Sequence, residues 1–139
     1  MPKPIERLQM RMRGELPKWP LPSLLGIRLT SVQPGHIMVE YEFNEQHQST
    51  DGLSIGVLCT MFDLAMYGAF GSTLEEGEVG TLLEMKINFL KHARKGTLRA
   101  TGKLVNGGRT IGLVECDILD DSQQLVAHAV GTCMKLENK

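Results

Sequence analysis

The chain has 139 residues and a formal net charge of -1, with 42% hydrophobic, 22% charged and 5% aromatic residues. These proportions are typical of one globular domain and exclude extensive disorder. The near-neutral charge gives no general attraction to nucleic acid or to a membrane surface, and the few aromatic residues argue against a surface for stacking bases.

The N-terminal segment carries charges throughout and lacks the apolar core of a signal peptide. Residues 5–13 predict a short basic amphipathic helix. Three prolines then predict an extended connector without regular structure. These prolines are Pro17, Pro20 and Pro22. We therefore expect residues 1–22 to form a helix and a connector, ahead of a single domain at 23–139.

Three cysteines, Cys59, Cys116 and Cys133, lie in apolar surroundings and lack the spacing of metal ligands. An odd number of such cysteines is typical of buried thiols in a reducing compartment. Together with the missing signal peptide, this pattern predicts a cytoplasmic protein.

Two stretches of alternating apolar and polar residues follow the connector. Residues 26–32 and 36–43 predict two strands, and the Pro34-Gly35 pair between them predicts a tight turn and hence a hairpin. The polar residues 44–52 predict an exposed loop.

The next stretch, residues 53–74, is apolar on nearly every face, and Asp63 is its single charged residue. Such a stretch predicts a helix inside the protein. A carboxylate there is costly unless it is hydrogen-bonded or performs chemistry, and desolvation would raise its pKa. Asp63 is therefore either a structural carboxylate, bonded to the backbone or to Thr60, or a catalytic base or nucleophile.

Four further strands are predicted at 79–91, 96–106, 109–119 and 123–136. The short turns between them, including the Asn-Gly-Gly sequence at 106–108, predict an antiparallel meander. A sheet of about six strands hides one long apolar helix only by curling around it. We therefore predict an α+β protein of the hot-dog fold, a curled antiparallel sheet around a central helix.

Four stretches in unbroken order carry a resemblance to a known family. They read SIGVLCTMFDLA at 54–65, TLLEMKINFLKHARKG at 81–96, GKLVNGGRTIGLVECDIL at 102–119 and LVAHAVGTCMKL at 125–136. Together with Gln48, this succession resembles the small hot-dog acyl-CoA thioesterases of the phenylacetate-pathway type. The resemblance implies hydrolysis of an acyl- or aryl-CoA thioester without a metal or a redox cofactor, CoA being part of the substrate.

The resemblance also implies roles for single residues. Asp63 falls on the acidic position that the family uses as general base or nucleophile. Gln48 falls where family members often carry an amide side chain that orients water or substrate. Thr81 lies near a position where the family often has a helper hydroxyl. Structural roles remain open for each of these residues.

The start of the apolar helix is expected to bind the thioester oxygen. Unpaired backbone N–H groups at a helix N-terminus suit an oxygen that gains negative charge, and Ile55 and Gly56 lie there. Asp63 lies about 12–14 Å further along the axis. A two-fold homodimer that runs two helices past one another would unite the groups in shared sites, and a homotetramer could pair two such dimers.

The helix start also departs from the family pattern. The family has a His-Gly pair where this chain has Ser54 and Ile55. Ser54 can cap the helix but cannot replace an imidazole. This departure favours the alternative of a non-catalytic acyl-CoA-binding protein on the same fold. A hydratase ranks last, because it would need a histidine paired with the acid.

Cations in two predicted turns could hold the phosphates of CoA. These residues are Lys91, Arg94, Lys95 and Arg109. The alternative is that they are ordinary solvated charges. Five residues of the apolar helix could line an acyl or aryl pocket or belong to the core, so the sequence specifies no particular acyl group. They are Met61, Phe62, Met66, Tyr67 and Phe70.

Overall fold

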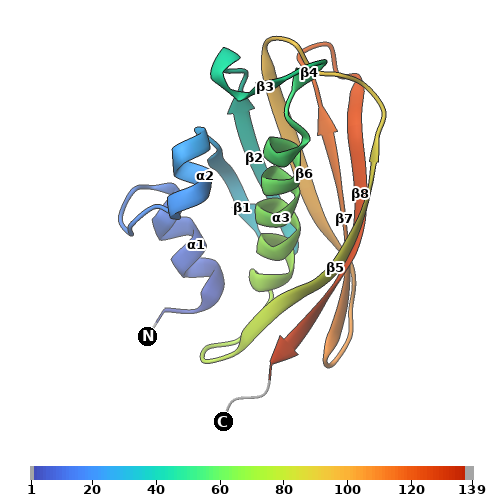
Figure 1. The fold of residues 1–139 in the computed structure, drawn as a ribbon. Coiled ribbons are helices and arrows are strands. Elements are labelled where there is room, and N and C mark those ends of the chain that lie inside the picture. The colour runs from blue at the N-terminus through green and yellow to red at the C-terminus, as the bar shows by residue number, and fades with distance from the viewer. Residues whose placement is uncertain (1, 137–139) are drawn as a thin grey trace.

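A six-stranded antiparallel sheet curves around one long helix in the computed structural model, which describes residues 2–136 (Figure 1). The central helix is α3 (Ile55–Gly71), and a 3-10 turn, η1 (Glu45–His47), precedes it. The sheet strands are β1 (Arg28–Gln33), β2 (His36–Glu42), β5 (Val79–Phe89), β6 (Thr97–Gly107), β7 (Ile111–Leu119) and β8 (Leu125–Leu136). A separate small ladder pairs β3 (Gln48–Ser49) with β4 (Gly52–Leu53). The predicted α+β hot-dog fold is confirmed.

The strand order is β1-β2-β6-β7-β8-β5, which differs from the predicted meander at one strand. Strands β6, β7 and β8 follow one another as hairpins, whereas β5 lies at the far edge and pairs with β8. The strand that follows α3 is β5, and it forms the edge of the sheet opposite the β1 edge. The connection 90–96 then crosses to β6, which pairs with β2. One side of β5 therefore has no partner strand within residues 2–136.

The core lies between α3 and the concave face of the sheet. On β2, the inward side chains of Ile37, Val39 and Tyr41 are fully buried, and each large apolar side chain buried in this way contributes about 1.5–3 kcal/mol. The helix approaches β6 closely at Gly102, where an added Cβ would lie 2.2 Å from the carbonyl oxygen of Ala65. Glycine at this position allows the helix to lie directly on the sheet.

The N-terminal segment forms two helices. The predicted first helix is confirmed as α1 (Pro4–Met12). The prediction of an extended connector is wrong for its last part, because Pro20 starts a second helix, α2 (Pro20–Leu25). Proline is compatible with a first helical turn, where an N–H has no intrahelical partner. Gly26, with a φ of 77°, ends α2 as a left-handed cap.

Both N-terminal helices pack onto the rest of the domain. Helix α1 contacts β1 and α3, and α2 contacts α3 (Figure 1). Apolar side chains of α1, among them Leu8 and Met12, pack against the core. Among the described residues, no helix is long and apolar enough to cross a bilayer.

Candidate active site

Asp63 lies on an exposed face of α3. The predicted buried helix is confirmed, since ten of its residues are buried, but one face, which includes Ile55, Gly56 and Asp63, is open in the single chain. Thr60 does not bond Asp63, since its hydroxyl donates to the carbonyl oxygen of Gly56 at 2.9 Å. Within residues 2–136, no hydrogen bond or ion pair engages the Asp63 carboxylate. The hydrogen bond to the backbone or to Thr60 that would give this carboxylate a structural role is therefore not formed within residues 2–136.

Asp63 lines a cavity of about 490 Å³, which lies between α3 and the two N-terminal helices. One wall comes from α3 and includes Asp63, Leu64 and Tyr67, and the opposite wall comes from α1 and the segment around Trp19. The side chain remains open to solvent, but the surrounding protein atoms partly desolvate it and raise the pKa of Asp63 above its ordinary value. A raised pKa suits a group that takes up a proton.

Tyr67 lies one turn after Asp63 on the same face of α3 and lines the same cavity. Its hydroxyl donates a hydrogen bond of 3.1 Å to the carbonyl oxygen of Gly80 on β5. Burial raises the pKa of Tyr67, and the charge of Asp63 raises it further. This bond ties the Asp63 face of the helix to the edge strand. Tyr67 is one of the residues for which the sequence left an acyl pocket or the core open, and the structure places it on the cavity wall.

The start of α3 presents one free backbone donor. The Ser54 hydroxyl accepts the N–H of Gly56 at 3.3 Å, and the Ser54 carbonyl oxygen accepts the N–H of Val57 at 3.1 Å. The Ile55 N–H has no acceptor in the part of the chain that the structure describes. The residue as a whole is 57% exposed. The amide of Ile55 is therefore available to an oxygen of a ligand.

Gln48 lies beside this helix start. Its backbone pairs with Leu53 in the small ladder, and its side chain is exposed. The preceding residue, His47, accepts the N–H of Ser54 on its carbonyl oxygen at 2.9 Å. Gln48, Ile55 and Gly56 are thus brought together at one end of α3.

The single chain does not bring every predicted site residue to one place. Asp63 is eight positions after Ile55, which corresponds to about 12 Å along the helix. Thr81 lies elsewhere. An added Cβ on Gly80 would point to Phe70 in the core, at 2.7 Å, so the alternation of a strand directs Thr81 to the outer face of the sheet.

The predicted phosphate-binding cations lie at two ends of the sheet. Arg94 is next to the start of α3: its neighbour Ala93 accepts the N–H of Leu53 at 2.8 Å, and its own side chain lies beside Gly52. Lys95 directly follows in the same exposed connection. Arg109 follows β6, and the eleven residues of that strand separate it from Lys95 by about 36 Å.

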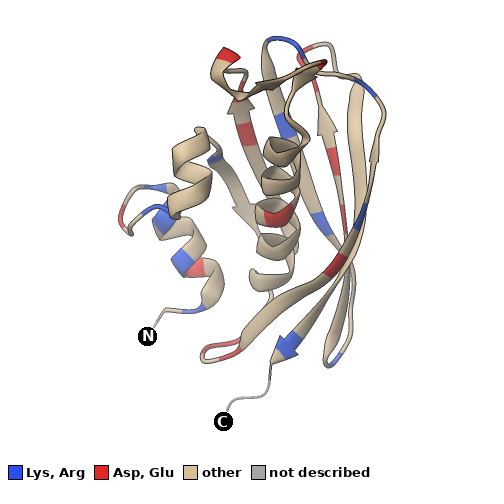
Figure 2. Cartoon of the chain, viewed as in Figure 1, with Lys and Arg blue, Asp and Glu red and all other residues tan. Residues whose placement is uncertain are grey.

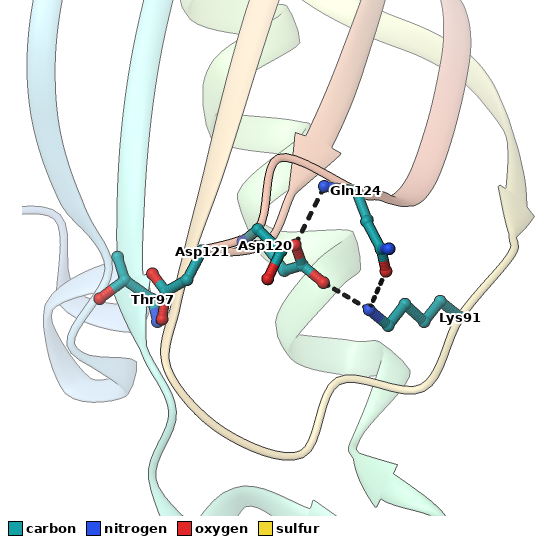
Figure 3. Close-up of polar contacts among 6 residues, drawn as sticks. Lys91, Thr97, Asp120, Asp121 and Gln124 are labelled. Carbon is teal, nitrogen blue, oxygen red and sulfur yellow. Dashed lines mark hydrogen bonds and ion pairs between the residues drawn. The ribbon is translucent and has the colours of Figure 1, made fainter.

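Lys91 is held by other residues. Its ammonium group lies 2.5 Å from Asp120 Oδ2 and 2.6 Å from Gln124 Oε1 (Figure 3). In the same turn, Asp121 accepts the N–H of Thr97 at 3.2 Å. Lys91 therefore connects the 90–96 segment to the β7–β8 turn and is less available to a phosphate than Arg94.

The described chain offers neither a reactive cysteine nor a cluster of metal ligands. The cysteines are free thiols, and desolvation raises the pKa of Cys133 to about 11 and that of Cys116 further. Burial also raises the pKa of Cys59. Such thiols are protonated at neutral pH and are poor nucleophiles. Residues 2–136 contain no group of three or more His, Cys, Asp or Glu side chains that could hold a metal ion.

Several known proteins are similar to this chain in sequence and in fold. The profile of the Thioesterase superfamily matches residues 53–127. A 1,4-dihydroxy-2-naphthoyl-CoA hydrolase of Listeria monocytogenes is 27% identical over 107 residues, which cover 76% of this chain and 87% of that protein. The crystal structure of a phenylacetic acid degradation-related protein from Ralstonia eutropha JMP134 gives a TM-score of 0.82 at 28% identity, covering 91% of this chain and 98% of that one.

A further solved structure, from Streptococcus mutans UA159 and bound to acetyl-CoA, gives a TM-score of 0.73 at 25% identity and covers 81% of this chain and 90% of that one. The matched segment contains α3 with Asp63 and extends into β8. The chain therefore belongs to the thioesterase superfamily and is a hydrolase that acts on thioesters.

Proposed function

We propose that this protein hydrolyses an acyl- or aryl-CoA thioester to the free acid and CoA, with Asp63 as general base or nucleophile. The observation that carries the proposal is the Asp63 carboxylate itself: it has a raised pKa, no partner within residues 2–136, and a position on the wall of a cavity. An ionised carboxylate in such a place is costly to keep unless it has chemistry to perform.

The chemistry needs two groups from the protein. As a general base, Asp63 removes a proton from water while the water oxygen attacks the thioester carbon; as a nucleophile, it attacks that carbon itself, and water then hydrolyses the resulting anhydride. In both cases the carbonyl oxygen gains negative charge, which the free N–H of Ile55 and the positive end of α3 stabilise. The carbon–sulfur bond breaks and CoA leaves as the thiolate. This route uses no metal and no redox cofactor.

A homodimer would unite these two groups. The unpaired edge of β5 exposes Val79, Leu83 and Phe89, and an apolar edge strand of this kind is a surface that pairs with another chain. A two-fold axis beside β5 would run the two α3 helices past each other and bring Asp63 of one subunit toward Ile55 of the other. The site would then be shared, and a monomer would be inactive.

The nucleotide of CoA would lie near the start of α3, where Arg94 and Lys95 could bind its phosphates. Arg109 could reach the same nucleotide only from a second subunit, because it lies at the opposite end of the sheet. The likeness to an acetyl-CoA-bound structure supports a CoA ester as the substrate. The free cysteines fit a reducing, cytoplasmic compartment.

Thiol release from a panel of acyl- and aryl-CoA esters tests this function. We expect hydrolysis of at least one ester by a dimeric or tetrameric species, with no added metal. If no ester is hydrolysed but one raises the unfolding temperature, the departure at Ser54 and Ile55 has made this chain an acyl-CoA-binding protein. An active monomer would contradict the shared site.

A further inference from the structure

Two arginines of α1 line the same cavity as Asp63. Arg7 and Arg11 lie one turn apart on the helix, and Trp19 lies on the same side of the cavity. Figure 2 shows basic positions on α1 and the single acidic position on α3, on the two helices that form the cavity walls. The N-terminal helices therefore bring two positive charges into a site whose other wall carries Asp63.

Neither arginine has an acidic partner in the part of the chain that the structure describes. Within residues 2–136, none of the ion pairs includes Arg7 or Arg11, although other cations of the chain, such as Arg13 and Lys135, are paired. Like charges one turn apart on a helix destabilise it. The pKa of Arg11 is lowered, first by burial and then by the charge of Arg7. The protein thus holds two adjacent cations without an acidic side chain to pair with either of them in the described chain.

Two neighbouring residues hold Arg11 in the cavity wall. Its guanidinium group lies over the ring of Trp19, 4.4 Å from the ring centroid, and one of its terminal N–H groups donates to the carbonyl oxygen of Pro17. Its Nε is buried and has no hydrogen-bond acceptor among the described residues. A buried donor without an acceptor is uncommon and costly, so the stability of the fold does not explain the position of Arg11.

We propose that Arg7 and Arg11 bind a carboxylate at the far end of the substrate's acyl group, so that the preferred substrate is the CoA thioester of a dicarboxylic acid. This inference rests on the proposed hydrolysis at Asp63. The arginines would hold the distal carboxylate while the thioester carbon lies at Asp63. Guanidinium groups are suited to this task because they present several fixed donors to a carboxylate.

The charges along the cavity agree with this arrangement. Desolvation raises the pKa of Asp63, and neither arginine forms an ion pair with this carboxylate within residues 2–136. Glu78, the other acid of the cavity wall, is already paired with Lys135 at 3.3 Å. Neither acid of the cavity wall therefore neutralises Arg7 or Arg11, so both can bind a negatively charged ligand.

The size and lining of the cavity favour an acyl carboxylate over a CoA phosphate. A cavity of about 490 Å³ is the size of a site for one small molecule or acyl group. The pantetheine arm of CoA separates its phosphates from the sulfur by more than such a cavity spans, so a thioester at Asp63 would place the phosphates outside. Leu8, Leu64 and Leu74 also line the cavity and suit the methylene groups of an acyl chain.

The test compares two esters of equal chain length, adipoyl-CoA and hexanoyl-CoA, which differ in the terminal carboxylate. We expect kcat/KM for adipoyl-CoA to exceed that for hexanoyl-CoA by roughly tenfold or more, the value of a charge-assisted hydrogen bond. The substitutions Arg7→Gln and Arg11→Gln should each bring this ratio toward one. Arg13→Gln is the matched control, because Arg13 pairs with Glu15 at 3.0 Å and does not line the cavity.

Several results would overturn the inference. Equal or faster hydrolysis of hexanoyl-CoA by the wild type would do so, as would a ratio that survives both substitutions or that falls equally in Arg13→Gln. If Arg11→Gln fails to fold, Arg7→Gln decides, since Arg7 is exposed. If the protein hydrolyses no ester at all, the proposed function fails, and calorimetric binding of the two esters still decides the inference: equal affinities overturn it.

Discussion

The hydroxyl oxygen of Tyr41 lies 2.7 Å from Nδ1 of His47 and joins the buried sheet to the loop that precedes α3. The same hydroxyl accepts the N–H of Asn44 at 3.2 Å, so it bonds both the ring of His47 and the backbone of the loop. His47 in turn accepts the N–H of Ser54 on its backbone carbonyl. The pair therefore holds both Gln48 and the free N–H of Ile55 in position, which makes Tyr41 and His47 positioning residues.

Replacement of either residue is expected to reduce activity more than folding alone explains. Tyr41→Phe leaves a backbone donor and a ring nitrogen without partners and should lower the free energy of unfolding by about 1–3 kcal/mol. His47→Ala should lower kcat by roughly tenfold at a temperature well below its melting point, with little change in KM. The control is His128→Ala, a histidine on the outer face paired with Asp117. Equal losses in His47→Ala and His128→Ala would show that His47 does not position the site.

The pH dependence of hydrolysis should report the raised pKa of Asp63. Both roles for Asp63 require the ionised carboxylate, so kcat/KM should fall as the pH drops through the folded-state pKa. Desolvation raises that pKa, so the acid limb should lie above the ordinary value of an aspartate. A pH series of initial rates, at pH values where the protein stays folded by circular dichroism, measures the limb. An acid limb at or below the ordinary value would contradict the desolvation argument.

Removal of the Asp63 charge should not cost stability. A folded-state pKa above the unfolded value means that the fold favours the neutral carboxyl group, so this contribution is present at acid pH and is lost as the pH rises through the folded pKa. Asp63→Asn should therefore melt at the same temperature as the wild type or slightly higher at pH 7. The difference should shrink toward acid pH. A melting temperature several degrees below the wild type at pH 7 would reveal a structural role for the carboxylate.

The cations near the start of α3 should matter for the nucleotide and not for the acyl group. Arg94→Gln combined with Lys95→Gln is expected to raise KM for a CoA ester several-fold, and to have little effect on the N-acetylcysteamine ester of the same acid, which lacks phosphates. Arg109→Gln should behave similarly if a second subunit supplies this residue. Equal effects on both kinds of ester would remove these residues from phosphate binding.

Local patterns predicted the central elements of the fold. The apolar stretch around Asp63 and the Asn-Gly-Gly turn each carry their own signal, so α3 and the β6–β7 hairpin could be predicted from the sequence. The place of β5 could not, because a short connection does not specify which edge of the sheet a strand joins. The extended connector predicted at Pro20 was wrong because proline is excluded from a helix interior but not from a first turn, and α2 starts at this residue.

Only the part of the site that lies on α3 could be predicted from the sequence. Asp63 and Ile55 share an exposed face because of their spacing on α3. The cavity depends instead on how α1 and α2 dock against α3, which no local pattern records. Arg7, Arg11 and Trp19 were therefore missed, although the basic amphipathic pattern of 5–13 was a signal that one side of this helix carries unusual charge.

The central claim is that Asp63 carries out thioester hydrolysis, and thiol release by the wild type, Asp63→Asn and Asp51→Asn tests it most directly. Asp51 is an exposed aspartate before α3 and controls for the loss of one negative charge. The account predicts that Asp63→Asn folds and dimerises as the wild type does but loses nearly all hydrolysis of the best ester, whereas Asp51→Asn retains it. Wild-type rates in folded Asp63→Asn would contradict the account.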